Sequence, residues 1–191
     1  MKLLVTGFEP FGGAVINPAW EAVRQLPDQI GNFTLQKLEI PTVFGKAGET
    51  VLAAIGTEAP DVVLCVGQAG GRSAITPERI AVNIRDARIC DNAGNQPRGM
   101  YVVPEGPAAY FATVDVIKLA EAVEKKGIPA TVSNSAGAFV CNDVFYTMLH
   151  HYHGTKTRVG FVHVPYLPEQ GSPSMELNQI INALNVIIEN L

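Results

Sequence analysis

The run Asp61–Val66 is apolar from its second residue to its last. A strand with one face in water alternates apolar and polar side chains. An unbroken apolar run is instead typical of a central strand covered by helices on both faces. Other short apolar runs alternate along the chain with segments of helical periodicity, which indicates an α/β fold with a largely parallel sheet. We therefore predict a three-layer α/β/α sandwich with a mixed, mostly parallel central sheet. Functional sites of such sheets usually lie at the carboxyl ends of the strands.

The same patterns predict the remaining elements. Further strands are expected at residues 2–6, 33–40, 130–133 and 158–164. Helices are expected to open at Asn17-Pro18, to run from about 45 to 58, from a Thr113 cap to Gly127, from 142 to 153, and from a Ser174 cap to the end of the chain. The last helix carries an apolar stripe formed by Leu177, Ile180, Ile181, Leu184, Ile187, Ile188 and Leu191. Residues 84–112 are rich in turn-forming sequences, so little regular structure is expected there.

Length and composition favour a single domain over residues 1–191, because 47% hydrophobic residues suffice for a well-buried core. The net charge of −4 and the lack of a basic run argue against a nucleic acid or an anionic membrane surface as partner. No stretch approaches the ~20 apolar residues of a membrane span, and the N-terminal apolar stretch is too short for a signal-peptide core. Three cysteines, an odd number in a chain that is not a small scaffold, favour free thiols in the cytosol.

Two motifs suggest chemistry that the residues do not support. The segment Gly7–Ala14 has the two glycines of a phosphate-binding P-loop but lacks its Lys and Ser/Thr, so nucleotide binding is rejected there. Its phenylalanines, Phe8 and Phe11, remain candidates for the wall of a pocket. The cluster His150-His151-Tyr152-His153 is interpreted as a helix end rather than a zinc site, because neighbouring side chains diverge around a helix axis.

Cys141 is the candidate nucleophile. It follows the small-residue segment 133–138 at the point where a helix is expected to begin. The positive end of a helix dipole lowers the pKa of a thiol, and free N–H groups of the same turn can stabilise an oxyanion. Position alone leaves an inert, buried cysteine equally open. Cys65, inside an apolar strand, and Cys90, beside turn residues, are interpreted as inert.

A cysteine nucleophile needs a base, and His163 is the one histidine outside the cluster. It lies near the carboxyl end of a predicted strand, although a core histidine satisfied by the backbone remains open. Glu78 is the candidate for orienting the imidazole. The alternative is an ordinary ion pair between Glu78 and Arg79 or another arginine, and spacing cannot decide between them.

Two long segments of the chain resemble those of a known family. The chain resembles the pyroglutamyl peptidase I (pyrrolidone-carboxylate peptidase) family of cysteine peptidases, above all in two long segments, 67–83 and 133–142, which match the family's patterns around its catalytic glutamate and cysteine. Further matches, over nearly the whole chain, are residues 7–13, 17–18, 41–44, 91–92, 106–110 and 163–166. Small departures occur near the nucleophile. Asp143 stands where many relatives carry His, and Ser135 and Ala138 replace common threonines.

The resemblance implies a triad of Cys141, His163 and Glu78 on a fold similar to that of purine nucleoside phosphorylases. It also implies a substrate pocket made of Phe8, Phe11, Gln68, Phe139 and Val140, and less surely of Asn17 and Ile89. No metal or cofactor is implied, and family members are usually cytosolic homotetramers. The implied substrates are peptides with an N-terminal pyroglutamyl residue. Phe8, Phe11 and Phe139 would sandwich its ring, while a backbone group near Gln68 or the Asn17 side chain would meet the lactam.

Two other classes of protein remain open from the sequence. A nucleoside- or nucleotide-handling enzyme on the related fold would need a phosphate site, against which the incomplete P-loop argues. An inactive binding protein would not need Cys, His and Glu in matching contexts.

Overall fold

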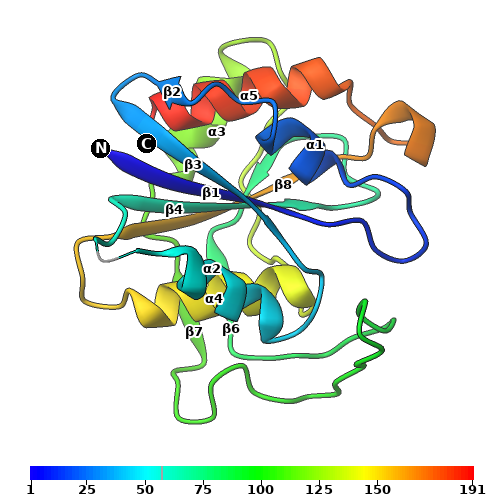
Figure 1. Ribbon diagram of the computed structural model, residues 1–191. Helices are drawn as coiled ribbons and strands as arrows, with labels where there is room; N and C mark the ends of the chain where they lie inside the picture. Colours follow the sequence, from blue (N-terminus) through cyan, green and yellow to red (C-terminus); the bar gives the residue numbers. More distant parts are fainter. Residues whose placement is uncertain (57) are drawn as a thin grey trace.

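The computed structural model describes residues 1–56 and 58–191. Within them, the central sheet has the strand order β2-β3-β1-β4-β8-β5 (Figure 1). The strands are β1 (Lys2–Phe8), β2 (Gln29–Ile30), β3 (Phe33–Ile40), β4 (Val62–Gln68), β5 (Thr76–Pro77) and β8 (Arg158–Val164). The pairs β3-β1, β1-β4 and β4-β8 are parallel, whereas the short outer strands β2 and β5 run antiparallel to their neighbours. The predicted mixed, mostly parallel sheet is thus confirmed.

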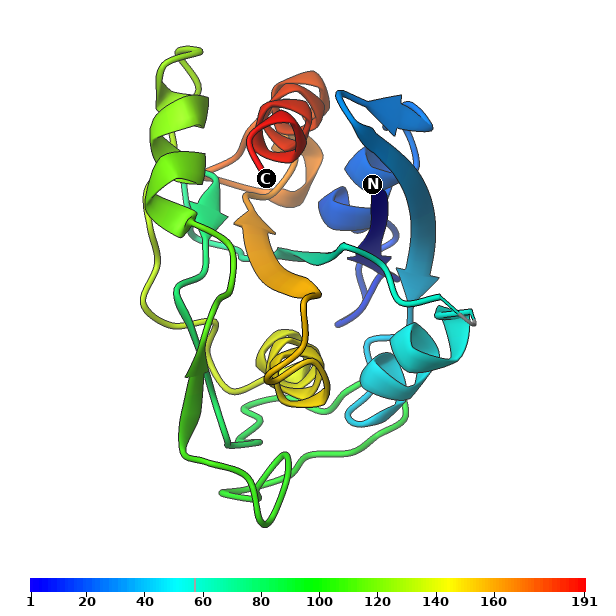
Figure 2. The same cartoon turned by 90° about the vertical axis from the view of Figure 1, so that its left-hand side faces the viewer.

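Helices cover both faces of this sheet (Figures 1 and 2). One face carries α1 (Pro18–Val23), α3 (Val116–Glu124) and α5 (Leu177–Glu189). The other face carries α2 (Lys46–Ala54) and α4 (Val140–His151). A separate antiparallel pair, β6 (Ile80–Val82) and β7 (Ala109–Phe111), contacts α4, and a short 3₁₀ turn, η1 (Pro168–Gln170), precedes α5. The three-layer α/β/α architecture is therefore confirmed. None of the described helices is long and apolar enough to cross a membrane.

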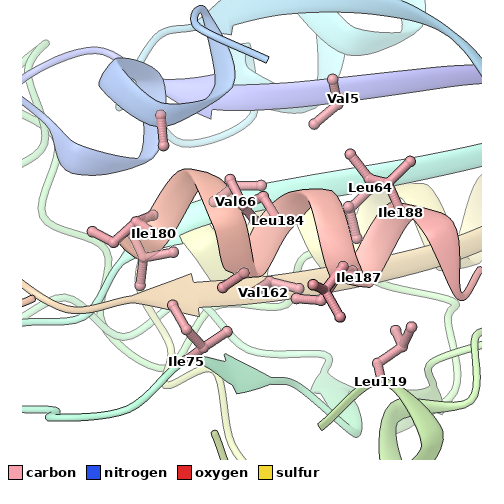
Figure 3. Close-up of a cluster of buried hydrophobic side chains, with 14 of the residues drawn as sticks. Val5, Leu64, Val66, Ile75, Leu119, Val162, Ile180, Leu184, Ile187 and Ile188 are labelled. Carbon is pink, nitrogen blue, oxygen red and sulfur yellow. The ribbon is translucent and has the colours of Figure 1, made fainter. Parts of the chain in front are cut away.

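Each face of the sheet has its own apolar core. On the α5 side, Ile180, Leu184, Ile187 and Ile188 of the predicted stripe are buried against side chains that include Leu64, Val66 and Val162 (Figure 3). The other members of the stripe, Leu177, Ile181 and Leu191, are half-buried at its margin. Each fully buried aliphatic side chain contributes about 1.5–3 kcal/mol to stability, so this stripe fixes α5 on the sheet.

Two predicted helix starts are wrong. Helix α3 begins at Val116 and is capped by Asp115, whose carboxylate accepts the Lys118 N–H at 3.1 Å. The predicted cap, Thr113, instead uses its hydroxyl oxygen to accept the backbone N–H of Val159 at 2.6 Å. Helix α5 begins at Leu177 after Glu176 rather than after a Ser174 cap. In both cases a hydroxyl residue two positions too early offered the right local chemistry, but tertiary contacts placed the first turn elsewhere.

Three other predicted boundaries also shift. Helix α2 ends at Ala54, short of the predicted 58, and Thr57 lies outside the described residues. Residues 130–133 are not a regular strand, because they pair with residues 75–78 only through isolated bridges. Helix α4 begins two residues before the predicted 142. The weak regular structure expected over 84–112 is confirmed, with β7 as its only strand among the described residues.

Candidate active site

The carboxyl ends of β1, β4 and β8 meet at one edge of the sheet, because these strands are parallel. A cavity of about 520 Å³ opens there. Its lining comes from the segments that follow the strands and from the start of α4: Phe8, Phe11, Asn17, Thr42, Gln68, Ala69, Gly70, Arg72, Asp86, Arg88, Ile89, Ser135, Ala136, Gly137, Ala138, Phe139, Cys141 and His163. The site therefore lies where a parallel sheet is expected to hold one.

Cys141 is the second residue of α4, as the sequence indicated. The turn before it includes Gly137 at φ 78°, a conformation that favours glycine. Phe139 occupies the N-cap position in an extended conformation, and no described side chain caps the helix. The first N–H groups of α4 therefore have no partner within the helix, and the N–H of Cys141 itself acts on its thiol.

Gly67 of β4 allows the thiol to reach the sheet. A Cβ atom built on Gly67 would lie 2.9 Å from Cys141 Sγ and 2.8 Å from the Phe161 ring. Gly67 is also the register partner of His163 on β8. Because the glycine leaves this space free, Cys141 Sγ occupies it and lies on the same face of the sheet as the imidazole.

His163 and Glu78 form a buried hydrogen-bonded pair. His163 Nδ1 lies 2.7 Å from Glu78 Oε1, and since a carboxylate only accepts, the imidazole donates. The two side chains are 4% and 0% exposed. The pairing follows from the antiparallel register of β5 with β8, which places Thr76 opposite His163. Just after β5, the Glu78 N–H donates to Phe161 O at 2.9 Å, which keeps Glu78 beside β8. Nε2 of the imidazole is thereby left available to the cavity.

Glu78 also has the arginine partner that the sequence left open. The partner is Arg72, not Arg79: Arg72 Nη1 donates to Glu78 Oε1 at 2.6 Å. Arg79 uses its backbone N–H to bond Ser133 O, and its side chain forms no ion pair with a described residue. The two interpretations of Glu78, as a partner of the histidine and as an ion pair, are therefore both realised.

Burial sets the protonation states of the site. Burial raises the pKa of Cys141 to about 12, and the negative charge of Glu78 adds to this rise. Burial likewise lowers the pKa of His163, although its hydrogen bond to Glu78 opposes the shift. For Glu78, burial alone would raise the pKa, but hydrogen bonds from His163 and Arg72 outweigh it and keep the carboxylate ionised. Burial and the helix start therefore act on the pKa of Cys141 in opposite directions.

Phe11 and Phe139 form the aromatic walls of the cavity. Their ring centroids are 6.0 Å apart with an interplanar angle of 39°, and Phe44 supports Phe139 edge-on at 5.2 Å. Phe8 is only 1% exposed and packs on Phe161. All three predicted rings therefore line the cavity, and Phe8 is the most buried of them. Ile89, 51% exposed, lies at the rim.

Three predicted pocket residues make contacts within the protein. The Asn17 side chain caps α1, accepting the Ala19 N–H at 3.0 Å and donating to Glu9 O at 3.1 Å. The Gln68 carbonyl oxygen accepts from Gln170 at 2.9 Å. Val140 does not line the cavity, because its side chain is fully buried in the α4-side core. Asn17 and Gln68 still line the cavity in addition to these contacts.

Sequence reasoning missed the charged residues of the cavity, Arg72, Asp86 and Arg88. Arg72 had a usable signal, because it is a charged residue in the Gly-rich loop directly after a central strand. Asp86 and Arg88 lie in the irregular segment 84–100, where no periodicity marks the inward side.

Asp143, the departure beside the nucleophile, is fully buried and paired. Its carboxylate binds Arg85 Nε at 2.5 Å and accepts the Gly45 N–H at 2.7 Å. It therefore ties α4 both to the start of α2 and to the segment that brings Asp86 and Arg88 to the cavity.

The histidine cluster is a helix end, as interpreted. His150 Nδ1 bonds the Tyr110 hydroxyl at 2.9 Å and its ring stacks on Tyr146 at an interplanar angle of 10°. In the described part of the chain, no three His, Cys, Asp or Glu side chains gather as a metal site would require.

Comparison with known proteins gives concordant results. The family model described as pyroglutamyl peptidase matches residues 1–191. A pyrrolidone-carboxylate peptidase of Levilactobacillus brevis is 52% identical, covering 98% of this chain and 96% of the relative. One from Bacillus thuringiensis is 47% identical, covering 98% and 91%. The crystal structure of pyroglutamyl peptidase I from Bacillus amyloliquefaciens superposes with a TM-score of 0.94 at 44% identity, covering 99% of this chain and 95% of that one.

Proposed function

The chain belongs to the pyroglutamyl peptidase family of cysteine omega peptidases, and we propose that Cys141, His163 and Glu78 carry out its reaction. The reaction is hydrolysis of the bond that follows an N-terminal pyroglutamyl residue. The observation that carries the assignment is a cavity lined by both a helix-start thiol next to Gly67 and a histidine that is hydrogen-bonded to a buried carboxylate. The nucleotide-handling and inactive alternatives have no support from the comparisons.

The chemistry follows from the arrangement of the thiol, the imidazole and the carboxylate. As Cys141 Sγ attacks the carbonyl carbon after the ring, its proton passes to His163, which becomes an imidazolium held by Glu78. The free N–H groups at the start of α4 are placed to receive the oxyanion. His163 then protonates the leaving amine and a thioester remains on Cys141. Water, activated by His163, hydrolyses the thioester and releases pyroglutamate.

The cavity suits an uncharged ring. Pyroglutamate is a lactam and carries no ammonium group, so the site needs no carboxylate for an amine. Two arginines and one aspartate line the cavity, and that aspartate, Asp86, is partly engaged by Arg98 at 3.5 Å. Phe11 and Phe139 offer faces to the ring. Since the Asn17 amide is used as a cap, backbone groups at the end of β4, near Gln68, are the better partners for the lactam.

A chromogenic pyroglutamyl anilide tests the activity. We expect the protein to release the dye and to lose this activity on treatment with iodoacetamide, which alkylates the thiol. A protein that leaves the anilide intact under conditions where the fold is retained would contradict the proposed function.

Replacing Glu78 with Gln keeps the size of the side chain but removes its charge. We expect kcat to fall strongly while KM changes little, because the carboxylate acts on the imidazolium formed in the transition state. The charge of Glu78 also raises the pKa of His163, so its loss should move the acid limb of kcat/KM to lower pH. The pH profile of anilide hydrolysis measures both effects. Normal turnover in Glu78→Gln would reduce Glu78 to a structural ion pair.

The family resemblance supports the remaining assignments. We propose that residues 1–191 act as one catalytic domain, since the family model spans them, and that the enzyme is a cytoplasmic homotetramer without a cofactor. Exposed apolar side chains such as Val15, Phe111 and Ile117 are available for subunit contacts. Sedimentation of the purified protein as a monomer would contradict the tetramer.

A further inference from the structure

Arg72 makes three contacts that join separate parts of the active site. Its Nη1 donates to Thr76 Oγ1 and to Glu78 Oε1, both at 2.6 Å, and its Nη2 donates to Ser135 O at 3.1 Å. Ser135 belongs to the turn that leads into the nucleophile, and Thr76 is the register partner of His163. One guanidinium therefore contacts the acid, the strand beside the base and the turn before Cys141.

The carboxylate that Arg72 binds is buried. Glu78 is fully buried, and its Oε2 has no hydrogen-bond partner among the described residues. The side-chain contacts to the carboxylate therefore meet at Oε1, which accepts from both Arg72 and His163. Arg72 itself is 30% exposed and lines both the cavity and a hollow on the outer side. It thus joins the buried carboxylate to the surface of the cavity.

We propose that Arg72 is a positioning residue of the peptidase, which aligns Glu78 on His163 and fixes the nucleophile's turn through Ser135. This inference rests on the proposed function. Arg72 also places a positive charge near the reacting pair. That charge opposes protonation of His163 and favours ionisation of Cys141, so it lowers the pKa of both groups.

Several other titratable groups lie around His163. Glu78 faces it from the segment after β5, and Cys141 from α4. Cys65 lies on the adjacent strand β4, while Asp86 and Arg88 line the same cavity from the segment 84–100. Of the acidic and basic groups, Glu78 and Arg72 are the two whose charges shift the pKa of His163, and they shift it in opposite directions.

The test is Arg72→Gln, with Arg79→Gln as matched control. In Arg72→Gln we expect kcat for the pyroglutamyl anilide to fall roughly 10- to 100-fold, since small misplacements of reacting groups have effects of this size. The acid limb of kcat/KM should move to higher pH, opposite to the shift expected for Glu78→Gln. Arg79→Gln removes the same charge one residue from Glu78 without touching the carboxylate, and should keep wild-type kcat and pH limb.

A second variant separates charge from geometry. Arg72→Lys keeps the charge, so the acid limb should stay in place. A single ammonium cannot reproduce the planar fork that spans Glu78 and Ser135, so kcat should still fall. If Arg72→Gln does not fold, Arg72→Lys decides: reduced kcat with an unmoved limb supports the proposal, and wild-type kcat overturns it. An acid limb that stays in place or moves to lower pH in a folded Arg72→Gln also overturns it.

The pH dependence of Cys141 alkylation by iodoacetamide needs no substrate. We expect the alkylation profile of Arg72→Gln to move to higher pH relative to wild type. If the wild type did not cleave the anilide, the proposed function would fail. The shift in the alkylation profile would still report whether Arg72 lowers the pKa of Cys141. An unshifted alkylation profile would overturn the electrostatic part of the proposal even in an active peptidase.

Discussion

Replacing Cys141 with Ser should abolish turnover of the pyroglutamyl anilide while leaving the fold intact. Loss of a nucleophile in a triad typically costs on the order of 10⁴ or more in rate. A serine hydroxyl is far less acidic than a thiol, and this site already raises the pKa of the cysteine by burial. Purified Cys141→Ser should show the circular dichroism and melting behaviour of the wild type with no measurable dye release. Substantial activity would refute the mechanism.

The other two cysteines supply the controls. Cys90 is exposed and Cys65 is fully buried, with its pKa raised to about 11 by that burial. Cys90→Ser should keep wild-type kcat. Cys65→Ala is preferred to a serine at this position, because a buried hydroxyl would add a desolvation cost of its own. If either variant loses turnover while remaining folded, the nucleophile has been assigned to the wrong cysteine.

Matched pyroglutamyl and prolyl anilides should differ in kcat/KM by a large factor, roughly 10⁴ in the favourable case of a site built to hydrogen-bond its substrate. The two rings are equal in size, but proline lacks the lactam carbonyl and carries a charged secondary amine. Transfer of that cation between Phe11 and Phe139 carries a desolvation cost. Arg72 and Arg88 line the same cavity and outnumber the single carboxylate of Asp86. The groups that await the lactam would also be left unpaired.

Measurement of kcat/KM for both anilides under identical conditions decides the point. A ratio within about tenfold corresponds to only 1.4 kcal/mol, less than the loss of one well-placed hydrogen bond with its desolvation. Such a ratio would show that the residues assigned to the substrate pocket are wrong, even if Cys141 proves to be the nucleophile. Asp86→Asn serves as control: if Asp86 does not meet a substrate amine, this variant should leave the ratio unchanged.

Local patterns in the sequence were sufficient for the frame of the site. The strands at 33–40 and 158–164 match their predicted bounds, because their apolar side chains are repeated at the spacing of a strand. Asn17-Pro18 opens α1 as predicted, since the cap and the proline act on the adjacent turn. The position of Cys141 at a helix start follows in the same way, from small residues before it and a helical pattern after it.

Contacts between distant segments were decided by the tertiary structure. Glu78 and His163 are 85 residues apart, and their pairing depends on which strand adds to the edge of β8 and in what register. The choice of Arg72 over Arg79 has the same origin, because Arg72 reaches Glu78 from the loop after β4 whereas Arg79, between β5 and β6, bonds Ser133 through its backbone. Val140 appeared beside the nucleophile in the sequence, yet the helix turns its side chain into the core.

The sequence by itself determined most of the elements and the layers, because spacing and capping residues specify them. Its long motifs singled out Cys141, His163 and Glu78 through the resemblance to a known family. Only the tertiary structure decided the direction in which the pKa values of these side chains shift. Burial raises the pKa of Cys141 and lowers that of His163, against the helix-start effect that favours a thiolate. Desolvation and Coulomb interactions depend on distances across the fold. Residues that are neighbours in space but not in sequence, such as Arg72 and Glu78, therefore determine these shifts.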